Sequence, residues 1–93
     1  MSGQAQGSVQ IDDTRVKVTQ WCFAPGASTG WHKHEYDYVV VPLTTGSLRL
    51  EERGGARVVQ LTAGVSYNRS AGVEHDVVNI NDFEFRFVEI ELK

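Results

Sequence analysis

The chain has 93 residues, of which 41% are hydrophobic and 23% are charged, and its formal net charge is -3. This length fits one domain, and the composition is that of a globular protein rather than a disordered or fibrous one. Lys and Arg occur singly along the chain and leave no extended positive surface for phosphate groups. We therefore expect no nucleic-acid partner.

The cellular setting follows from the cysteine content and from the lack of targeting signals. Cys22 is the single cysteine, so neither an internal disulfide nor a thiolate metal cluster can form. Residues 1–10 have neither the basic start nor the apolar stretch of a signal peptide, and no apolar run approaches the length of a membrane span. We expect a cytoplasmic protein with no membrane partner.

In chain order, residues 1–10 are polar and show no apolar period, which predicts a flexible or strand-swapped arm. The folded domain is expected over residues 11–93. There, short segments rich in β-branched and aromatic residues are separated by turn residues about every ten residues, as in an all-β sandwich or barrel. No segment has a convincing helical period. The expected strands span residues 14–23, 36–43, 47–52, 57–61, 66–68, 75–80 and 83–92.

Two of these segments carry further information. Residues 36–43 are apolar on both faces, so their outer face needs a covering layer, either a partner subunit or the N-terminal arm, and we expect a homodimer. In the last segment the apolar residues change from one face of the strand to the other: Phe85 and Phe87 lie on one face, and Val88 and Ile90 lie on the opposite face. A β-bulge near Phe87 and Val88 is one explanation.

The three histidines of the chain are the candidate functional residues. His32 and His34 stand at the start of one expected strand and His75 at the start of another. Residues two apart on a strand share a face, with Cα atoms about 6 to 7 Å apart, so two imidazoles at this spacing can converge on one ion. His75 is the candidate third ligand, which would leave the opposite side for water or substrate. The alternative is structural, with half-buried or hydrogen-bonded histidines and no ion.

The residues around these histidines resemble the two sequence motifs of the cupin family, over residues 26–79. The first motif is matched by Gly26, five residues, His32, Lys33, His34 and a later Gly46. The second is matched by Gly64, five residues, Ser70, Ala71, Gly72, two residues, His75, three residues and Asn79, with Ser70 where proline is usual. The resemblance implies a double-stranded β-helix, the RmlC-like jelly-roll barrel of two antiparallel sheets, with a metal ion inside its mouth.

One position departs from the family pattern in an informative way. The first motif usually has a glutamate ligand a few residues after its second histidine, and Tyr38 stands there. A neutral phenol is a poor ligand, so we expect a metal site of His32, His34 and His75. The missing carboxylate favours an anionic or bidentate oxygen ligand on the ion. Three imidazoles suit iron, zinc, nickel or copper and, less well, manganese, so the sequence does not choose the divalent metal.

Other side chains near the histidines are secondary candidates. Strand alternation would place Tyr36 and Tyr38 on the histidine face, where they are candidate catalytic groups, by hydrogen bonding or acid–base chemistry, or simply core residues. Glu35 and Asp37 would point outward and would reach the ion only through a bulge.

Cupins host many reactions and also binding domains, so fold and metal together do not name a reaction. Residues 31–43 look like those of small bacterial single-domain cupins, some of which are linked to β-alanine degradation. Our first hypothesis is an enzyme that holds a small carboxylate or oxyanionic metabolite at the metal site for dioxygenase-like, hydrolytic or lyase chemistry. The second is a small-ligand-binding module without turnover, its metal structural or absent. A third is a metal-free barrel of structural or sugar-binding type.

Overall fold

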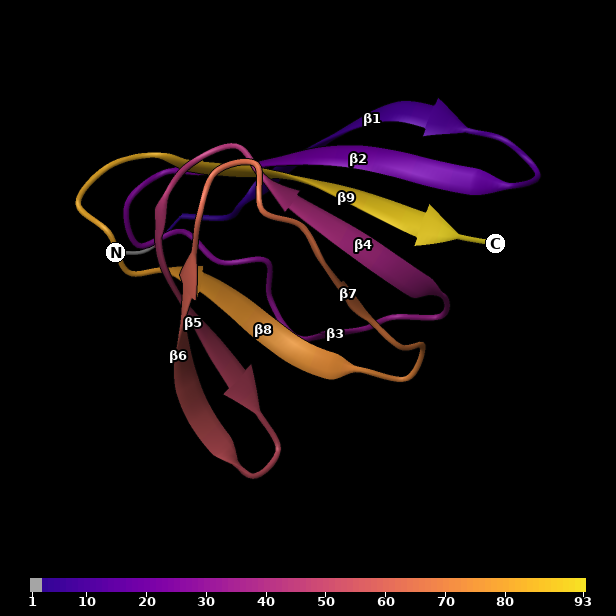
Figure 1. The fold of residues 1–93 in the computed structure, drawn as a ribbon. Helices are drawn as coiled ribbons and strands as arrows, with labels where there is room; N and C mark the ends of the chain where they lie inside the picture. Colours follow the sequence, from indigo (N-terminus) through magenta and orange to yellow (C-terminus); the bar gives the residue numbers. More distant parts are fainter. Residues whose placement is uncertain (1–2) are drawn as a thin grey trace.

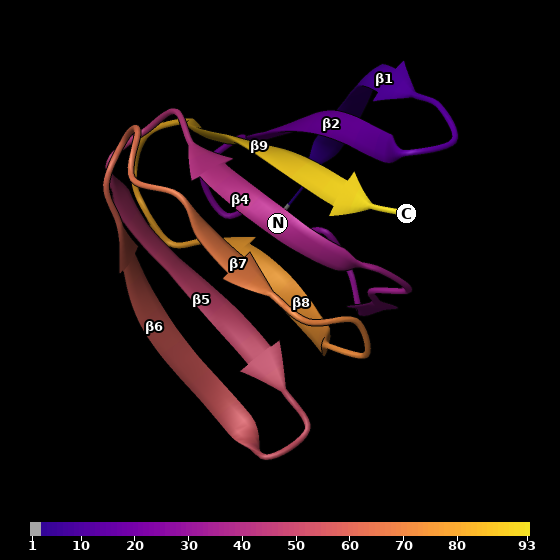
Figure 2. The same ribbon diagram turned by 45° about the vertical axis from the view of Figure 1, so that its right-hand side comes forward.

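The computed structural model describes residues 3–93, which form nine strands in two antiparallel sheets. The larger sheet has the strand order β1-β2-β9-β4-β7 and the smaller one β3-β8-β5-β6, and Figures 1 and 2 show the two sheets facing each other. The described residues contain no helix that is long and apolar enough to cross a membrane. In chain order, the strands are β1 (Gln6–Asp12), β2 (Val16–Phe23), β3 (His32–Lys33), β4 (Asp37–Pro42), β5 (Gly46–Glu52), β6 (Gly55–Leu61), β7 (Tyr67–Arg69), β8 (Glu74–Asn79) and β9 (Phe85–Leu92).

This all-β jelly-roll architecture confirms the fold class predicted from the sequence. Each of the seven expected strands matches an observed strand to within two residues at either end. The hairpin between β5 and β6 turns at Arg53 and Gly54, and Gly55, which begins β6, has a φ of 130°, which only glycine adopts readily. Alternation of apolar and polar residues is therefore a sound guide to most of this fold.

Part of the N-terminal segment, which we expected over residues 1–10 to be a flexible or strand-swapped arm, forms a strand. Residues 6–10 lie in β1, which pairs with β2 of the same chain at the edge of the larger sheet (Figure 1). The backbone N–H of Ala5 donates to the carbonyl of Ser28 at 2.8 Å. All seven residues of β1 are exposed, so the strand has no buried face and shows no apolar period in the sequence. Met1 and Ser2 lie outside the described residues.

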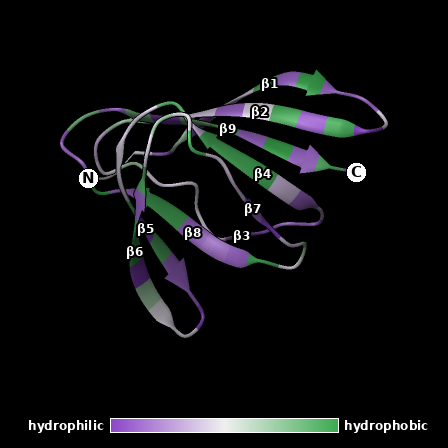
Figure 3. Cartoon of the chain, in the orientation of Figure 1, coloured by the Kyte–Doolittle hydropathy of each residue, from purple (hydrophilic) through white to green (hydrophobic). Residues whose placement is uncertain are grey.

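Strand β9 corrects a second expectation. It pairs in unbroken register with β2 and β4 on its two sides, so there is no bulge near Phe87 and Val88. Its inward side chains are Phe85 and Phe87 followed by two glutamates, and its outward side chains become apolar from Val88 onward. The apolar phase changes because carboxylates replace phenyl rings on the inner face, and Figure 3 shows the resulting alternation along β9. The register shift found in this sheet lies in β1, between Val9 and Ile11.

The apolar core lies at one end of the barrel, around the fully buried side chains of Phe23, Phe85 and Leu48. The rings of Phe23 and Phe87 lie 5.4 Å apart between centroids. Each such buried side chain contributes about 1.5–3 kcal/mol to the free energy of folding. Because β9 runs from Phe85 in this core to Leu92 at the far end, its glutamates lie towards the other, polar end of the barrel.

Asn79, the asparagine of the second motif, links several backbone segments at the apolar end of the barrel, which we call the closed end. Its side chain is fully buried, and its Oδ1 accepts a hydrogen bond from the backbone N–H of Asn81 at 2.9 Å. Its Nδ2 donates to the backbone carbonyl groups of Phe23, Ala24 and Phe83. The Asn81 side chain leaves no room for a Cβ atom at Gly46, where it would lie 2.8 Å from Asn81 Oδ1. Close packing therefore explains two of the motif residues.

Candidate metal centre

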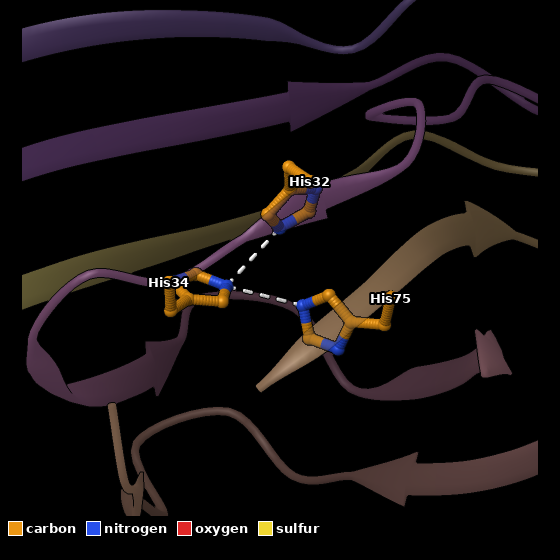
Figure 4. Close-up of side chains that lie close together, drawn as sticks. All are labelled: His32, His34 and His75. Carbon is orange, nitrogen blue, oxygen red and sulfur yellow. Dashed lines mark hydrogen bonds between the residues drawn. The ribbon is translucent and has the colours of Figure 1, made fainter. Parts of the chain in front are cut away.

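The three histidines lie together between the two sheets (Figure 4). His32 belongs to β3, His34 follows it directly, and His75 belongs to β8. The Nε2 atom of His34 is 3.1 Å from the Nε2 atoms of both His32 and His75. One ring nitrogen from each histidine falls within 4.8 Å of the others. The structure thus brings together the three side chains that the sequence singled out as ligands.

Backbone pairing holds these histidines in place. His32 lies directly opposite His75 in the antiparallel pair of β3 and β8. The N–H of His34 donates to the carbonyl of Val73 at 2.9 Å, and the N–H of Gly72 donates to the carbonyl of His34 at 2.8 Å. Gly72 has a φ of 96°, and this glycine conformation lets the chain turn immediately before β8. Backbone hydrogen bonds therefore hold the segment of His32 and His34 against the segment that contains His75.

The ring of His32 is oriented by a second hydrogen bond. Its Nδ1 lies 2.9 Å from the carbonyl oxygen of Gly30, so Nδ1 carries the proton and donates it. Gly30 is itself held by Asp76, whose Oδ1 accepts from the Gly30 N–H at 3.0 Å. This arrangement leaves the Nε2 lone pair of His32 directed at the other two rings, as in histidines that bind metals.

The electrostatics of the cluster suit a cation. His34 and His75 are each 7% exposed. Burial, followed by the charge of His32, lowers the pKa of both to about 4. Both rings are therefore neutral near pH 7, which is the form that binds metals. Neutral imidazoles whose Nε2 atoms converge cannot all donate to one another, and a divalent ion satisfies the lone pairs that remain.

The histidines form part of the wall of a cavity of about 790 Å³ that both sheets line. This volume lies within the range of small-molecule sites, which is about 300–1,000 Å³. Tyr38 also lines the cavity, is 2% exposed, and stacks on the ring of His34 with 3.9 Å between centroids. Burial, with the nearby Glu89 charge, raises the pKa of the Tyr38 hydroxyl well above its usual range. That hydroxyl stays protonated and can donate a hydrogen bond.

The other sequence candidates are placed differently. Strand β3 ends at Lys33 and β4 begins at Asp37, so the alternation that would align Tyr36 with Tyr38 is interrupted. Tyr36 is not among the residues of the cavity wall. The carboxylate of Asp37 accepts a hydrogen bond from the N–H of Ala71 at 2.8 Å. Neither Asp37 nor Glu35 joins the histidine cluster, although Glu35 lines the cavity.

Sequence reasoning missed two residues of the cavity wall, Glu89 and Glu91. Both lie on the inner face of β9, and Glu91 is directly opposite Tyr38 in the pairing of β4 with β9. Their sequence signal was the unbroken two-residue period that they share with Phe85 and Phe87. The polar end of the cavity therefore combines imidazoles, a phenol and two carboxylates.

The jelly-roll barrel, the histidine triad and the motif glycines define the class of this protein. The family model for the cupin domain matches residues 19–91, and the chain belongs to that family.

Individual relatives are also similar along the whole chain. The β-alanine degradation protein BauB of Pseudomonas aeruginosa is 55% identical over 95 residues, which cover 100% of both chains. The crystal structure of a cupin domain from Bordetella pertussis is 59% identical with a TM-score of 0.99, covering 100% of this chain and 97% of that one. A double-stranded β-helix protein from Klebsiella pneumoniae shares the fold at 22% identity, with a TM-score of 0.79 over 99% of this chain and 79% of that one.

Proposed function

We propose that the protein is a metal-dependent enzyme that acts on a small carboxylate or oxyanionic metabolite. The metal is a divalent ion held by His32, His34 and His75, and the chemistry is dioxygenase-like, hydrolytic or lyase chemistry. The observation that carries this proposal is the convergence of three imidazoles, two of them kept neutral by burial, in the wall of a cavity of small-molecule size. Three protein ligands leave positions free for a substrate, which is the arrangement of catalytic rather than structural sites.

The substrate class is supported by charge and by one relative. The first motif lacks its carboxylate ligand, so a divalent ion here keeps its full charge and favours an anionic oxygen ligand. The similar protein from Pseudomonas aeruginosa is named for β-alanine degradation, and β-alanine is a short carboxylic acid. Both points favour small carboxylates as the first compounds to test.

Protein groups around the site have distinct tasks in this proposal. A bound ion would supply a Lewis acid and, for a redox metal, an electron source. The hydrogen bond from His32 Nδ1 to Gly30 keeps the Nε2 lone pair available. Tyr38 remains protonated and donates a hydrogen bond to an oxygen of the bound substrate. The apolar wall around Val40 and Leu48 excludes water from that contact.

Metal content of untagged protein, purified without chelators, tests this proposal. We expect about one equivalent of a transition metal in the wild type. The His34→Ala variant should lose the metal. The matched control is Lys33→Ala, which removes an exposed side chain between two ligands and should retain the metal. Iron would lead to oxygen-uptake assays with short carboxylates. Equal metal content in wild type and His34→Ala, or no metal after reconstitution, would overturn the three-histidine site.

The second candidate is a small-ligand-binding module without turnover. It is favoured by the burial of Tyr38, which at 2% exposure and stacked on His34 resembles a packed core residue more than a mobile acid–base group. Metal-loaded protein that binds short carboxylates but leaves them unchanged over long incubation, with and without oxygen, would support this alternative.

We also propose that the protein is a cytoplasmic homodimer. Val18, Ile90 and Val39 are cross-strand neighbours on the outer face of the larger sheet, where no other described element covers them. A second copy placed on this face would bury them. Light scattering after size exclusion tests the assembly: Ile90→Lys should convert dimer to monomer, whereas Val58→Lys, on an exposed position of β6, should not. A monomeric wild type would contradict the proposal.

A further inference from the structure

Strand β9 turns two carboxylates into the cavity that contains the histidines. Glu89 and Glu91 share the inner face of β9, and both line that cavity. Glu89 is 8% exposed. Burial, followed by the like charge of Glu91 on the same strand, raises the pKa of Glu89 to about 7. Burying carboxylates is unfavourable unless a cation compensates them.

Protein cations do not supply that compensation. The ion pairs among residues 3–93 involve neither Glu89 nor Glu91. Lys17, across from Glu91 on β2, lowers the pKa of Glu89 through its charge but forms no ion pair with it. Lys33 and two arginines also line the cavity. Lys33 is exposed and forms no ion pair with either glutamate, and both arginines have other contacts. Arg57 pairs with Glu52 at 2.8 Å, and Arg69 donates to the carbonyl of Asn68 and lies over a tyrosine ring.

Aromatic rings complete this part of the cavity wall. Trp21, Tyr38 and Tyr67 line the same cavity as the two carboxylates. The faces of aromatic rings attract ammonium groups, most strongly where water is excluded. A buried carboxylate and a half-buried one beside aromatic rings therefore form an environment for an organic cation rather than for a second anion.

We infer that Glu89 and Glu91 bind the ammonium group of a ligand whose anionic end lies at the histidine site. The ligand class is thus a short zwitterionic amino acid rather than a simple carboxylate. This inference rests on the proposed function, because the histidine site is assigned the anionic end. It goes beyond that function by assigning a second binding site at the polar end of the cavity.

Paired ligands that differ only in the amine test the inference. Calorimetric titration of zinc-loaded protein compares glycine, β-alanine and 4-aminobutyrate with acetate, propionate and butyrate. We expect at least one amino acid to bind about tenfold or more tightly than its amine-free partner, since a hydrogen bond to a charged group contributes about 1.5–3 kcal/mol. The amino acid that shows the largest difference in affinity from its amine-free partner indicates, by the length of its carbon chain, the distance between the two binding sites.

Variants assign the preference to the carboxylates. Glu89→Gln keeps the shape of the side chain and should abolish the preference for the amine while retaining zinc, and Glu91→Gln should reduce it. Glu84→Gln, outside the cavity wall, is the matched control and should leave the preference unchanged. Circular dichroism checks that each variant is folded. Equal binding of amino acids and amine-free acids, or a preference that survives in both Glu89→Gln and Glu91→Gln, would overturn the inference.

A further experiment distinguishes failure of the carboxylate site from failure of the histidine site. If the wild type retains no zinc, the proposed function fails, and metal-free protein is titrated with propylamine instead. Binding of propylamine that is lost in Glu89→Gln would still support the carboxylate site. No binding of propylamine would overturn it together with the metal site.

Discussion

The Nε2 atoms of His34 and His75 lie 3.1 Å apart, although 41 residues separate the two histidines along the chain. Backbone hydrogen bonds from His34 to Val73 and from Gly72 to His34 produce this proximity. The cluster is therefore built by strand pairing and not by flexible side chains that would need an ion to assemble them. A preformed site of this kind binds without a large loss of conformational entropy.

Metal binding to this preformed site should stabilise the fold. At a free zinc concentration about 100-fold above Kd, linkage adds about 2.7 kcal/mol to the free energy of unfolding. For a domain of this size, each kcal/mol raises Tm by roughly 4–8 °C, so a rise of more than about 10 °C is expected. Scanning calorimetry with and without zinc measures this change. The Tm of His75→Ala should rise very little on adding zinc. A rise equal to that of the wild type would mean that zinc binds at a site other than the histidine cluster.

Replacing Tyr38 with phenylalanine separates hydrogen bonding from packing. Because the Tyr38 hydroxyl is not part of the ligand cluster, Tyr38→Phe should keep the metal content of the wild type. If the hydroxyl donates to the substrate, turnover at equal metal loading should fall at least about tenfold. Tyr36→Phe is the matched control, since Tyr36 lies outside the cavity wall, and its turnover should not change. Equal rates in both variants would leave Tyr38 a packing residue.

Sequence reasoning succeeded where side-chain alternation and motif spacing were intact. The strands around Leu48 and Val77 and the convergence of His32, His34 and His75 follow from local patterns. Sequence reasoning failed where the path of the chain, or the surroundings of a side chain, depends on residues that are distant in the sequence. β1 has no buried face to produce a period, and its pairing with β2 is visible only in three dimensions. Strand β3 ends at Lys33 and β4 begins at Asp37, and Tyr36 between them lies outside the cavity wall, which two-residue spacing alone does not reveal.

The glutamates of β9 illustrate a different limit. Inward carboxylates at positions 89 and 91 contradict the usual rule that charged residues face water, so a bulge was one explanation of the sequence pattern. The structure keeps the register and places both carboxylates in a cavity. Departures from local rules of this kind concentrate at functional sites. Alternation along the strand was enough to predict that these two side chains point inward. That charged side chains can occupy inward positions here became clear only from the cavity in the structure.

Asn79 should be among the most sensitive positions for stability. Asn79→Ala removes the side-chain donor of the Phe23 and Phe83 carbonyl groups and the acceptor of the Asn81 N–H in the closed end of the barrel. Each buried group left without a partner costs about 1–3 kcal/mol, so we expect a loss of at least about 3 kcal/mol in the free energy of unfolding. Asn68→Ala, at an exposed position of β7, should change it by less than about 0.5 kcal/mol. Urea denaturation compares the variants, and similar midpoints would refute the role assigned to Asn79.

Glu89 should make stability depend on pH in the opposite direction to an ordinary surface carboxylate. Its pKa rises from 4.5 in the unfolded chain to about 7 in the fold, so between these values the folded state binds more protons. The contribution of Glu89 to stability is therefore complete below pH 4.5 and is lost as pH rises through about 7. The ionisable groups that interact with it are Glu91 on its own strand, Lys17 on β2, Tyr38 on β4 and Tyr67 on β7.

The Glu89→Gln variant isolates this effect in metal-free protein. Urea denaturation at pH 5 and pH 8 should show wild type losing stability relative to Glu89→Gln by on the order of 2–3 kcal/mol as pH rises. Glu84→Gln is the control, because the Arg86 guanidinium lowers the pKa of Glu84. Glu84 is therefore largely ionised in both the folded and the unfolded state from pH 5 upward, and its difference from wild type should stay nearly constant. A constant difference between wild type and Glu89→Gln across this pH range would mean that Glu89 is already ionised at pH 5. The carboxylate pair would then hold its charge without an added cation, which would remove one support for an ammonium-binding site.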